Sequence, residues 1–180
     1  MTLEVEKKYR ITRRQHASLI KRLAVAKYLG EEFEENTIYT HPDIDLGNAI
    51  VRLRKIGDSG LLTYKKRLPG AAGIKHQKEI ETPVSDPDAM IEILSTIGFT
   101  PVLFYEKFRQ TWAINSVEVV VDRLPFGLFV EIEGSERSIK SAEKKLKMEN
   151  FRVEHATYPQ LTREHGVQTG ELFSAKFTQQ

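Results

Sequence analysis

The segment Glu4-Val5-Glu6-Lys7-Lys8-Tyr9-Arg10, close to the N-terminus, carries a charged side chain at every second position. Successive side chains of a β-strand point to opposite faces, so a strand here would place these four charges, from Glu4 to Arg10, on one face. The segment therefore predicts a strand with one strongly charged side.

The same two- or four-residue spacing of charge recurs on five further predicted strands. In an ordinary antiparallel sheet, the face turned to water carries scattered charges of mixed sign. Here nearly every set carries one sign, and the six sets are Glu4/Glu6/Lys8, Arg52/Arg54, Glu79/Glu81, Lys107/Arg109, Glu118/Asp122 and Glu131/Glu133. The alternate positions are apolar, as at Val51 and Leu53, and are predicted to pack under helices.

Turn and capping residues divide the chain into extended and helical segments. Strands are predicted at residues 4–10, 37–39, 49–55, 61–67, 76–82, 103–114, 117–123 and 128–134. Helices are predicted from the capping box of Thr12 and Gln15 to a stop near Gly30, from Asp86 to Gly98, from Ser138 to about residue 150, and after Tyr158. No linker divides the chain, so we expect one α+β domain over residues 1–180, with an irregular tail at about 170–180.

The composition is that of a folded, soluble protein of 180 residues, with 40% hydrophobic and 29% charged side chains. The absence of cysteine excludes disulfides and thiolate chemistry, and it favours a cytoplasmic location. Neither a signal peptide nor a run long enough to cross a membrane is visible, so no membrane partner is expected. With 27 basic and 25 acidic side chains, the charge is too balanced to predict nucleic-acid binding. The sequence leaves open whether the chain forms a homodimer.

A closed β-barrel accommodates all six charged faces at once, because interior positions alternate along every strand and a wide barrel encloses a ligand site. For any single pair, a solvated outer face is the simpler interpretation. When all six sets are considered together, a shared charged lumen and a solvated outer face are about equally favoured.

The charges of such a lumen predict its ligand. Clustered guanidinium and ammonium groups suit the oxygens of a polyphosphate, since arginine donates two parallel hydrogen bonds; the candidates are Lys8, Arg52, Arg54, Lys65, Lys107 and Arg109. The carboxylates would repel that anion unless divalent ions bound both groups. We therefore expect Mg²⁺ or Mn²⁺ together with a small triphosphate compound.

Several motifs follow one another in a fixed order along the chain. They are Glu4-Val5-Glu6-Lys7-Lys8, Val51-Arg52-Leu53-Arg54, Leu62-Thr63-Tyr64-Lys65, Lys78-Glu79-Ile80-Glu81, Glu106-Lys107-Phe108-Arg109, Val121-Asp122-Arg123-Leu124 and Gly127-Leu128-Phe129-Val130-Glu131-Ile132-Glu133. This ordered set resembles the CYTH domain of the triphosphate tunnel metalloenzymes. That family includes class IV adenylyl cyclases, thiamine triphosphatases and inorganic triphosphatases.

The resemblance implies a closed, eight-stranded antiparallel β-barrel, or tunnel, with helices packed outside. It implies that Lys8, Arg52, Arg54, Lys65, Lys107 and Arg109 hold the triphosphate, and that Glu4, Glu6, Asp122, Glu131 and Glu133 carry metal. Lys8, Lys65, Glu81 and Asp122 form the candidate catalytic set. Lys66 has the opposite strand parity to Lys65 and would replace it after a one-residue slip, but we favour Lys65.

The resemblance leaves three functions open. We favour metal-dependent hydrolysis of inorganic triphosphate, or of an organic triphosphate such as thiamine triphosphate, because both Glu131 and Glu133 are present to hold metal and water. The alternative enzyme is a class IV adenylyl cyclase, in which a ribose oxygen attacks ATP; residues 41–43, His-Pro-Asp, resemble that branch. A non-catalytic module that binds polyphosphate or nucleotide is the third hypothesis.

Overall fold

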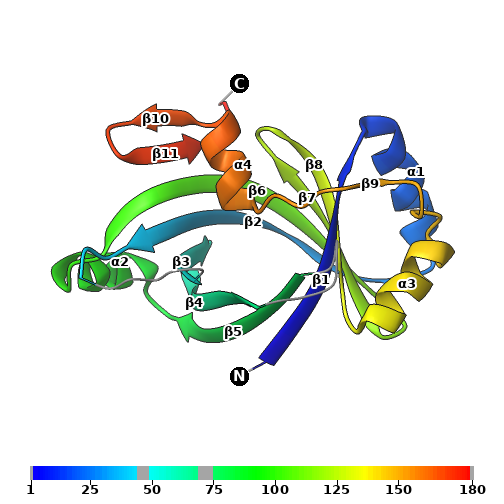
Figure 1. Ribbon diagram of the computed structural model, residues 1–180, viewed down its shortest axis with the longest axis horizontal. Coiled ribbons are helices and arrows are strands. Elements are labelled where there is room, and N and C mark those ends of the chain that lie inside the picture. The colour runs from blue at the N-terminus through cyan, green and yellow to red at the C-terminus, as the bar shows by residue number, and fades with distance from the viewer. Residues whose placement is uncertain (1, 44–48, 69–74, 179–180) are drawn as a thin grey trace.

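The computed structural model describes residues 2–43, 49–68 and 75–178, and the side chains of residues 2–4, 67, 75 and 76 lie outside the description (Figure 1). Eight long strands form its body: β1 (Thr2–Ile11), β2 (Lys27–Thr40), β3 (Ala49–Ile56), β4 (Ser59–Leu68), β5 (Lys75–Val84), β6 (Thr100–Ile114), β7 (Val117–Leu124) and β8 (Gly127–Glu133). The helices are α1 (Arg13–Leu23), α2 (Pro87–Thr96), α3 (Glu136–Lys145) and α4 (Tyr158–His165). Three short strands complete the sheet: β9 (Arg152–Val153), β10 (Val167–Thr169) and β11 (Leu172–Ala175).

The long strands pair in an antiparallel series that returns to its starting strand. The order is β6-β2-β3-β4-β5-β1-β8-β7, and β7 pairs again with β6. The strand β1 is staggered, because residues 2–6 pair with β5 while residues 6–11 pair with β8. The predicted eight-stranded antiparallel barrel is therefore confirmed, as a curled sheet with a staggered seam at β1.

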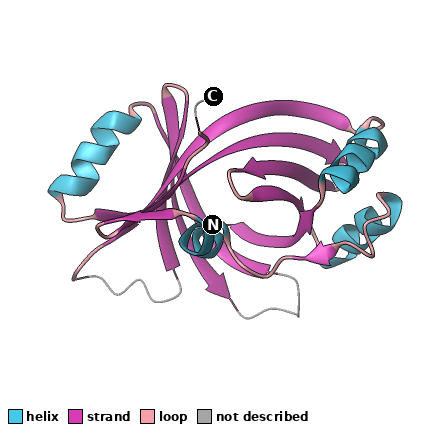
Figure 2. Cartoon of the chain, turned by 90° about the horizontal axis from the view of Figure 1, so that it is seen from above, coloured by secondary structure: helices cyan, strands magenta, loops and turns pink. Residues whose placement is uncertain are grey.

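Helices lie against the outer face of the barrel at its two ends (Figure 2), and the side chains beneath them are apolar. At one end α1 and α3 pack on β7 and β8, and the buried side chains there include Leu19, Leu23, Val119, Val121, Val130, Ile132, Ile139 and Leu146. At the other end α2 brings Leu94 against Tyr39 and Leu53. Each such buried aliphatic side chain contributes about 1.5–3 kcal/mol, so the apolar face fixes which side of each strand points inward.

The helix α4 differs from the other three, because it lies across one end of the lumen. Phe129 and Tyr105 are on the same faces of their strands as Glu131 and Lys107, and they form an apolar cluster with Tyr158 and Leu161 of α4. The inner face thus changes from charged to apolar along single strands. The expectation that all helices pack outside the barrel is corrected at this one element.

The predicted end of the first helix is also corrected. The capping box of Thr12 and Gln15 starts α1 as predicted, but the helix ends at Leu23 and does not run on to Gly30. Gly30 lies inside β2, at φ +143°, beside a shift in the register between β2 and β6. A glycine adopts this backbone conformation without the steric cost of a Cβ atom, which suits a bulge.

Near the C-terminus, the structure differs from the prediction in two places. The cap of α3 is Ser135, whose hydroxyl accepts a hydrogen bond from the backbone N–H of Ser138, so the predicted cap lies in the first turn. The tail is not irregular throughout, since β11 pairs in parallel with residues 103–105 of β6. The strand β7 pairs with residues 108–114 only, and β11 covers the backbone groups that β7 leaves at this edge.

No helix in the described ranges has both the length and the apolar character needed to span a membrane.

Candidate active site in the tunnel

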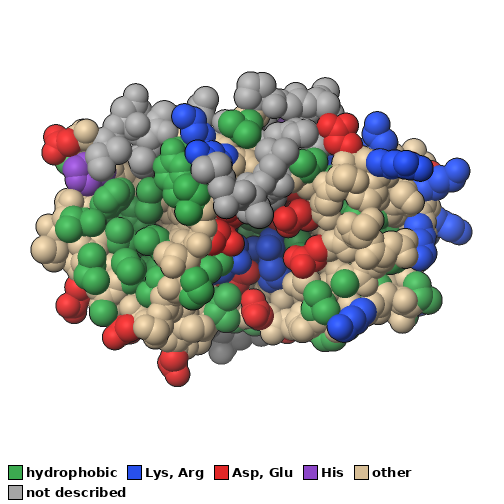
Figure 3. Space-filling model, turned by 90° about the horizontal axis from the view of Figure 1, so that it is seen from below, with side chains coloured by type: hydrophobic (Ala, Val, Ile, Leu, Met, Phe, Trp, Pro, Cys, Tyr) green, Lys and Arg blue, Asp and Glu red, His purple; other side chains and the backbone are tan. Residues whose placement is uncertain are grey.

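A polar cavity of about 470 Å³ occupies the lumen of the barrel. Figure 3 shows basic and acidic side chains gathered in a hollow at the centre of one face. The cationic set that lines the cavity is Lys8, Arg52, Arg54, Lys65, Lys107 and Arg109. The acidic set is Glu6, Glu79, Glu81, Glu118, Glu131 and Glu133. All predicted site residues line this cavity except Asp122, which lies behind it, and Glu4, whose side chain is outside the described part.

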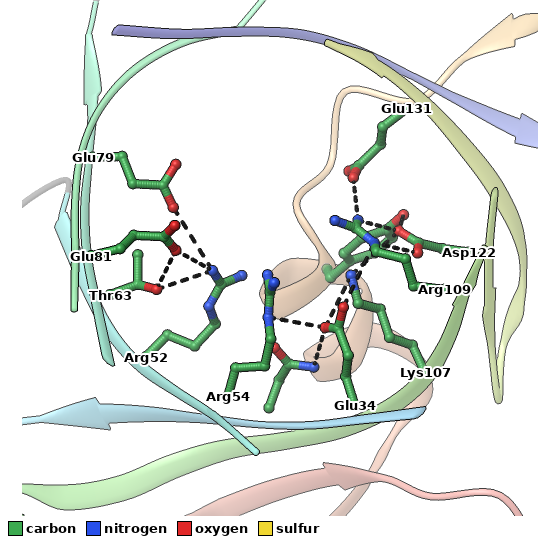
Figure 4. Close-up of polar contacts among 12 residues, drawn as sticks. Glu34, Arg52, Arg54, Thr63, Glu79, Glu81, Lys107, Arg109, Asp122 and Glu131 are labelled. Atoms are coloured by element: carbon green, nitrogen blue, oxygen red, sulfur yellow. Dashed lines mark hydrogen bonds and ion pairs between the residues drawn. The ribbon is translucent and has the colours of Figure 1, made fainter. Parts of the chain in front are cut away.

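One group of contacts crosses β3, β4 and β5 (Figure 4). A terminal nitrogen of Arg52 donates to Thr63 Oγ1 at 3.2 Å and to Glu81 Oε1 at 3.4 Å, and the hydroxyl of Thr63 donates to the same Glu81 oxygen at 2.7 Å. Burial alone would raise the pKa of Glu81, but the hydrogen bond from Thr63 and the charge of Arg52 lower it. Glu81 therefore stays ionised and holds Arg52 in place.

The two candidate lysines of β4, Lys65 and Lys66, lie on opposite sides of the barrel wall. Lys65 Nζ lies 3.2 Å from Glu79 Oε2, and the two residues are register partners across β4 and β5. Lys66 is exposed and has the opposite strand parity. The geometry therefore places Lys65 in the cavity wall and Lys66 outside it, which is the arrangement we favoured.

A second group of contacts joins β6, β7, β8 and α4. Asp122 has no exposed surface and receives a bidentate pair of hydrogen bonds from Arg109, Nε to Oδ1 at 2.8 Å and Nη2 to Oδ2 at 2.6 Å. Tyr158 of α4 also donates to Asp122 Oδ2, at 2.8 Å. Burial alone would raise the pKa of Asp122, but Arg109 and Lys107 hold it well below its usual range. With both oxygens engaged, Asp122 anchors Arg109, and this geometry disfavours the metal-ligand role expected for it.

The remaining contacts orient the two lysines of this wall. Lys8 Nζ lies 4.2 Å from the centre of the Tyr158 ring and 3.9 Å from Glu131 Oε1. Lys107 Nζ lies 3.5 Å from Asp122 Oδ2. Burial lowers the pKa of Lys107 to about 8, and Arg109 adds to this effect, while Asp122 and a second carboxylate, Glu34, oppose it. The charge of Lys107 thus depends on its carboxylate neighbours.

Comparison with known proteins assigns this arrangement to a family. The family model named CYTH domain matches residues 2–158 of the 180-residue chain. The chain belongs to the CYTH family.

Individual relatives carry the names of two activities. A protein of Methanocaldococcus jannaschii, whose name describes it as a candidate adenylate cyclase, is 29% identical over 149 residues, covering 80% of this chain and 83% of the relative. A solved structure from Pyrococcus horikoshii is 25% identical with a TM-score of 0.76, covering 88% of this chain and 98% of that one. A Hippeastrum protein, named as a candidate adenylyl cyclase with a dominant triphosphatase activity, has a TM-score of 0.74 at 16% identity and covers 92% of this chain and 97% of its own. The likeness to the Hippeastrum protein concerns the fold alone.

The CYTH tunnel also contains polar residues that the sequence analysis missed. Glu34 and Asn36 of β2 are fully buried, and Glu34 lies 3.0 Å from Arg54 Nε and 3.3 Å from Lys107 Nζ. They were missed because residues 31–36 form a run of mostly acidic side chains that looks like a solvated surface. Extending the predicted strand at residues 37–39 toward the N-terminus by the two-residue period would have placed both on the inner face.

Whether the CYTH site can hold a metal ion depends on how closely its carboxylates approach one another. In the described part of the chain, no three acidic or histidine side chains converge closely enough to hold an ion by themselves. Pairs of carboxylates are nevertheless brought together by register: Glu133 of β8 faces Glu6 of β1 on one side and Glu118 of β7 on the other.

The pH dependence of stability tests the buried charge of Glu34. Burial alone would raise its pKa, but Lys107, Arg54 and Arg109 lower it from 4.5 to about 2. A depressed pKa in the folded state contributes stability above the unfolded value, and this contribution is lost as the pH falls from about 4.5 toward about 2. We expect Glu34→Gln to be less stable than the wild type in urea unfolding at pH 7, with a difference that shrinks steadily between pH 5 and pH 2.5. Glu35→Gln, on the opposite face of the same strand, should show no such trend, and a pH-independent difference for Glu34→Gln would contradict the assignment.

Proposed function

We propose that this CYTH chain is a triphosphatase dependent on Mg²⁺ or Mn²⁺, which hydrolyses the terminal phosphoanhydride bond of inorganic triphosphate or of an organic triphosphate such as thiamine triphosphate. The observation that carries the proposal is the tunnel cavity of about 470 Å³, in which six cationic side chains share the walls with six carboxylates. A cavity of this size suits a small ligand.

The cationic set supports a linear, highly charged anion as the substrate. Its members come from β1, β3, β4 and β6, so cations reach the cavity from several sides of the barrel. Guanidinium groups donate paired hydrogen bonds to phosphate oxygens, while lysines act as compact point charges. A chain of phosphates would therefore find partners along its length.

The acidic set supports a divalent ion. Glu6 and Glu133 are directly opposed register partners, and opposed side chains of this kind have Cβ atoms about 4.5–5.5 Å apart. Like charges so close are unfavourable unless a cation neutralises them, and Mg²⁺ is typically bound by one or two carboxylates together with phosphate oxygens. The pair fits such an ion, with Glu131 one position further along the same face. When bound, the metal neutralises charge on the phosphates and lowers the pKa of a bound water.

The protein itself contributes mainly position and charge. Phosphoryl transfer requires little covalent chemistry from side chains and depends on in-line placement and on stabilisation of the equatorial oxygens. Lys8 and Lys65 neutralise charge on the phosphoryl group, and Arg52 and Arg109 bind oxygens. Glu81 and Asp122 act one step further away, because each fixes one of these arginines. Water is the nucleophile.

A class IV adenylyl cyclase is the second candidate function. It is favoured by the name of the Methanocaldococcus jannaschii relative, to which this chain is 29% identical. The segment that resembled the cyclase branch has a local structural partner, since His41 Nε2 lies 3.0 Å from the carbonyl oxygen of Ile97 and its ring contacts Phe99. That segment therefore adds little to the cyclase hypothesis. A silent polyphosphate-binding module is the third.

Product analysis separates these functions. Purified protein is incubated with inorganic triphosphate, thiamine triphosphate or ATP, each with Mg²⁺, Mn²⁺ or EDTA, and phosphate, pyrophosphate and cyclic AMP are quantified. We expect metal-dependent release of phosphate, and the rates rank the substrates. Cyclic AMP with pyrophosphate from ATP would replace the hydrolase with a cyclase. Binding of triphosphate without any product would leave a binding module.

The acidic pair gives a more specific prediction. Glu6→Gln keeps the shape of the side chain and removes one of the opposed carboxylate charges, so kcat should fall about 100-fold or more, as expected when a group that stabilises the transition state is lost. The loss should be partly relieved by higher Mg²⁺ concentration. Glu92→Gln, on the exposed surface of α2, is the control, and an unchanged kcat for Glu6→Gln would remove Glu6 from the metal site.

The adjacent lysines of β4 provide a matched pair of variants. Lys65→Met removes a charge from the cavity wall, and the loss of a charged hydrogen bond worth about 1.5–3 kcal/mol should raise the Kd for inorganic triphosphate about 10–100-fold. Lys66→Met removes the same charge from the outer face and should change the Kd less than about twofold. Isothermal titration calorimetry measures both, and equal effects would show that only net charge matters.

A further inference from the structure

Glu34, like Asp122, differs from the carboxylates that line the tunnel cavity. The six members of the acidic set line the cavity, whereas Glu34 has no exposed surface and lies in the wall, behind the cationic side chains. A triphosphate or a metal ion in the cavity would meet the cations before it reached this carboxylate. Its role therefore differs from direct binding of substrate or metal.

The position of Glu34 lets one carboxylate contact cations from two neighbouring strands. It is the register partner of Lys107 on β6, and Asn36, two residues further along the same face, is the partner of Arg54 on β3. Glu34 Oε2 lies 3.0 Å from Arg54 Nε and 3.3 Å from Lys107 Nζ, and Oε1 lies 3.7 Å from Arg109 Nε. The side-chain amide of Asn36 donates to Oε2 at 3.2 Å. Half of the cationic set thus meets at this group.

The wall around Glu34 contains buried polar atoms that make no hydrogen bond in the structure. Five buried side-chain atoms in the described part of the chain lack a hydrogen-bond partner, and four of them belong to Glu34, Asn36, Arg52 and Arg54 on β2 and β3. The Arg54 contact is accordingly an ion pair whose angles depart from those of a hydrogen bond. A buried polar atom left unsatisfied is unfavourable, and such atoms are expected where function requires them.

We propose that Glu34 is a positioning residue for substrate binding, which rests on the proposed function of the tunnel. Lysine and arginine side chains have many rotamers, and a ligand that must order them loses affinity. Glu34 fixes Arg54, Lys107 and Arg109 from behind before the triphosphate arrives. The cations then present their remaining nitrogens to the cavity in one arrangement.

Two possible roles for the Glu34 carboxylate predict opposite effects of Glu34→Gln on the affinity for triphosphate. If Glu34 only reduces the positive potential of the cavity, then Glu34→Gln makes the site more positive by one charge and binds triphosphate more tightly. If Glu34 positions the cations, the same substitution removes one of the restraints on each of three side chains and weakens binding. Glu34→Asp separates the roles again, because it keeps the charge and withdraws the carboxylate from its partners by one methylene group.

The test compares the wild type, Glu34→Gln, Glu34→Asp and the control Glu35→Gln, all checked for folding by thermal unfolding. The Kd for inorganic triphosphate is measured by calorimetry with EDTA present, and KM and kcat are measured with Mg²⁺. We expect both Glu34 variants to raise the Kd and the KM about 10–100-fold, the usual cost of losing an outer partner of a binding site, and Glu35→Gln to match the wild type. If Glu34→Gln does not fold, Glu34→Asp decides the question alone.

The outcomes separate the two levels of the proposal. Wild-type turnover with unchanged or tighter binding by the Glu34 variants overturns the positioning role and leaves the triphosphatase in place. Wild-type protein that neither binds nor cleaves triphosphate overturns both.

Discussion

The tunnel depends on the compensation of charges that face inward. A charge removed from water is costly unless opposite charges and hydrogen bonds surround it, and a barrel with a charged inner face meets this requirement only if each strand faces a complementary neighbour. The register supplies that complement at Lys8 and Glu131, at Lys65 and Glu79, and at Arg109 and Asp122. A slip of one residue would turn each strand's charges outward and its apolar side chains into the lumen. These opposed pairs therefore favour the same register as the apolar face does.

The apolar outer face provides the stability that a charged interior does not. The helices α1, α2 and α3 cover this face at the two ends of the barrel, and a third apolar cluster lies inside, where α4 crosses the lumen. Tyr158 belongs to both regions, because its ring packs in the inner cluster while its hydroxyl donates to Asp122. The polar cavity is thereby joined to the packed part of the protein through one side chain. The packing of Tyr158 therefore also restrains the charged end of Lys8, which lies over its ring, and that of Arg109, which is bound by Asp122.

The two reactions considered for this chain, hydrolysis and cyclisation, make the same demands on the charges of the tunnel. Both reactions require a polyphosphate held in line and a cation to neutralise developing charge, and they differ in the attacking oxygen and in the phosphorus attacked. In the function we propose, the phosphates are held by side chains that belong to the barrel itself. Whether water or a ribose oxygen attacks depends on where the bound chain of phosphates ends in the tunnel. That position is a property of the complex with substrate.

The sequence by itself determined the alternation of charge and the apolar face opposite to it. Both are local properties with a period of two residues, so β3, β4, β7 and β8 could be placed to within a few residues, and Lys65 could be preferred to Lys66. The ordered motifs added the family, and with it the curling of the eight antiparallel strands around a lumen. Tertiary structure alone decided which charges meet. The sharing of Glu34 among three cations, the burial of Asp122 beneath Arg109 and the hydroxyl of Tyr158 all join residues far apart in the chain, and no short sequence period encodes such contacts. The strand β11 was missed for the same reason, since its partner lies about seventy residues away on β6 and its own sequence is too short to carry a pattern.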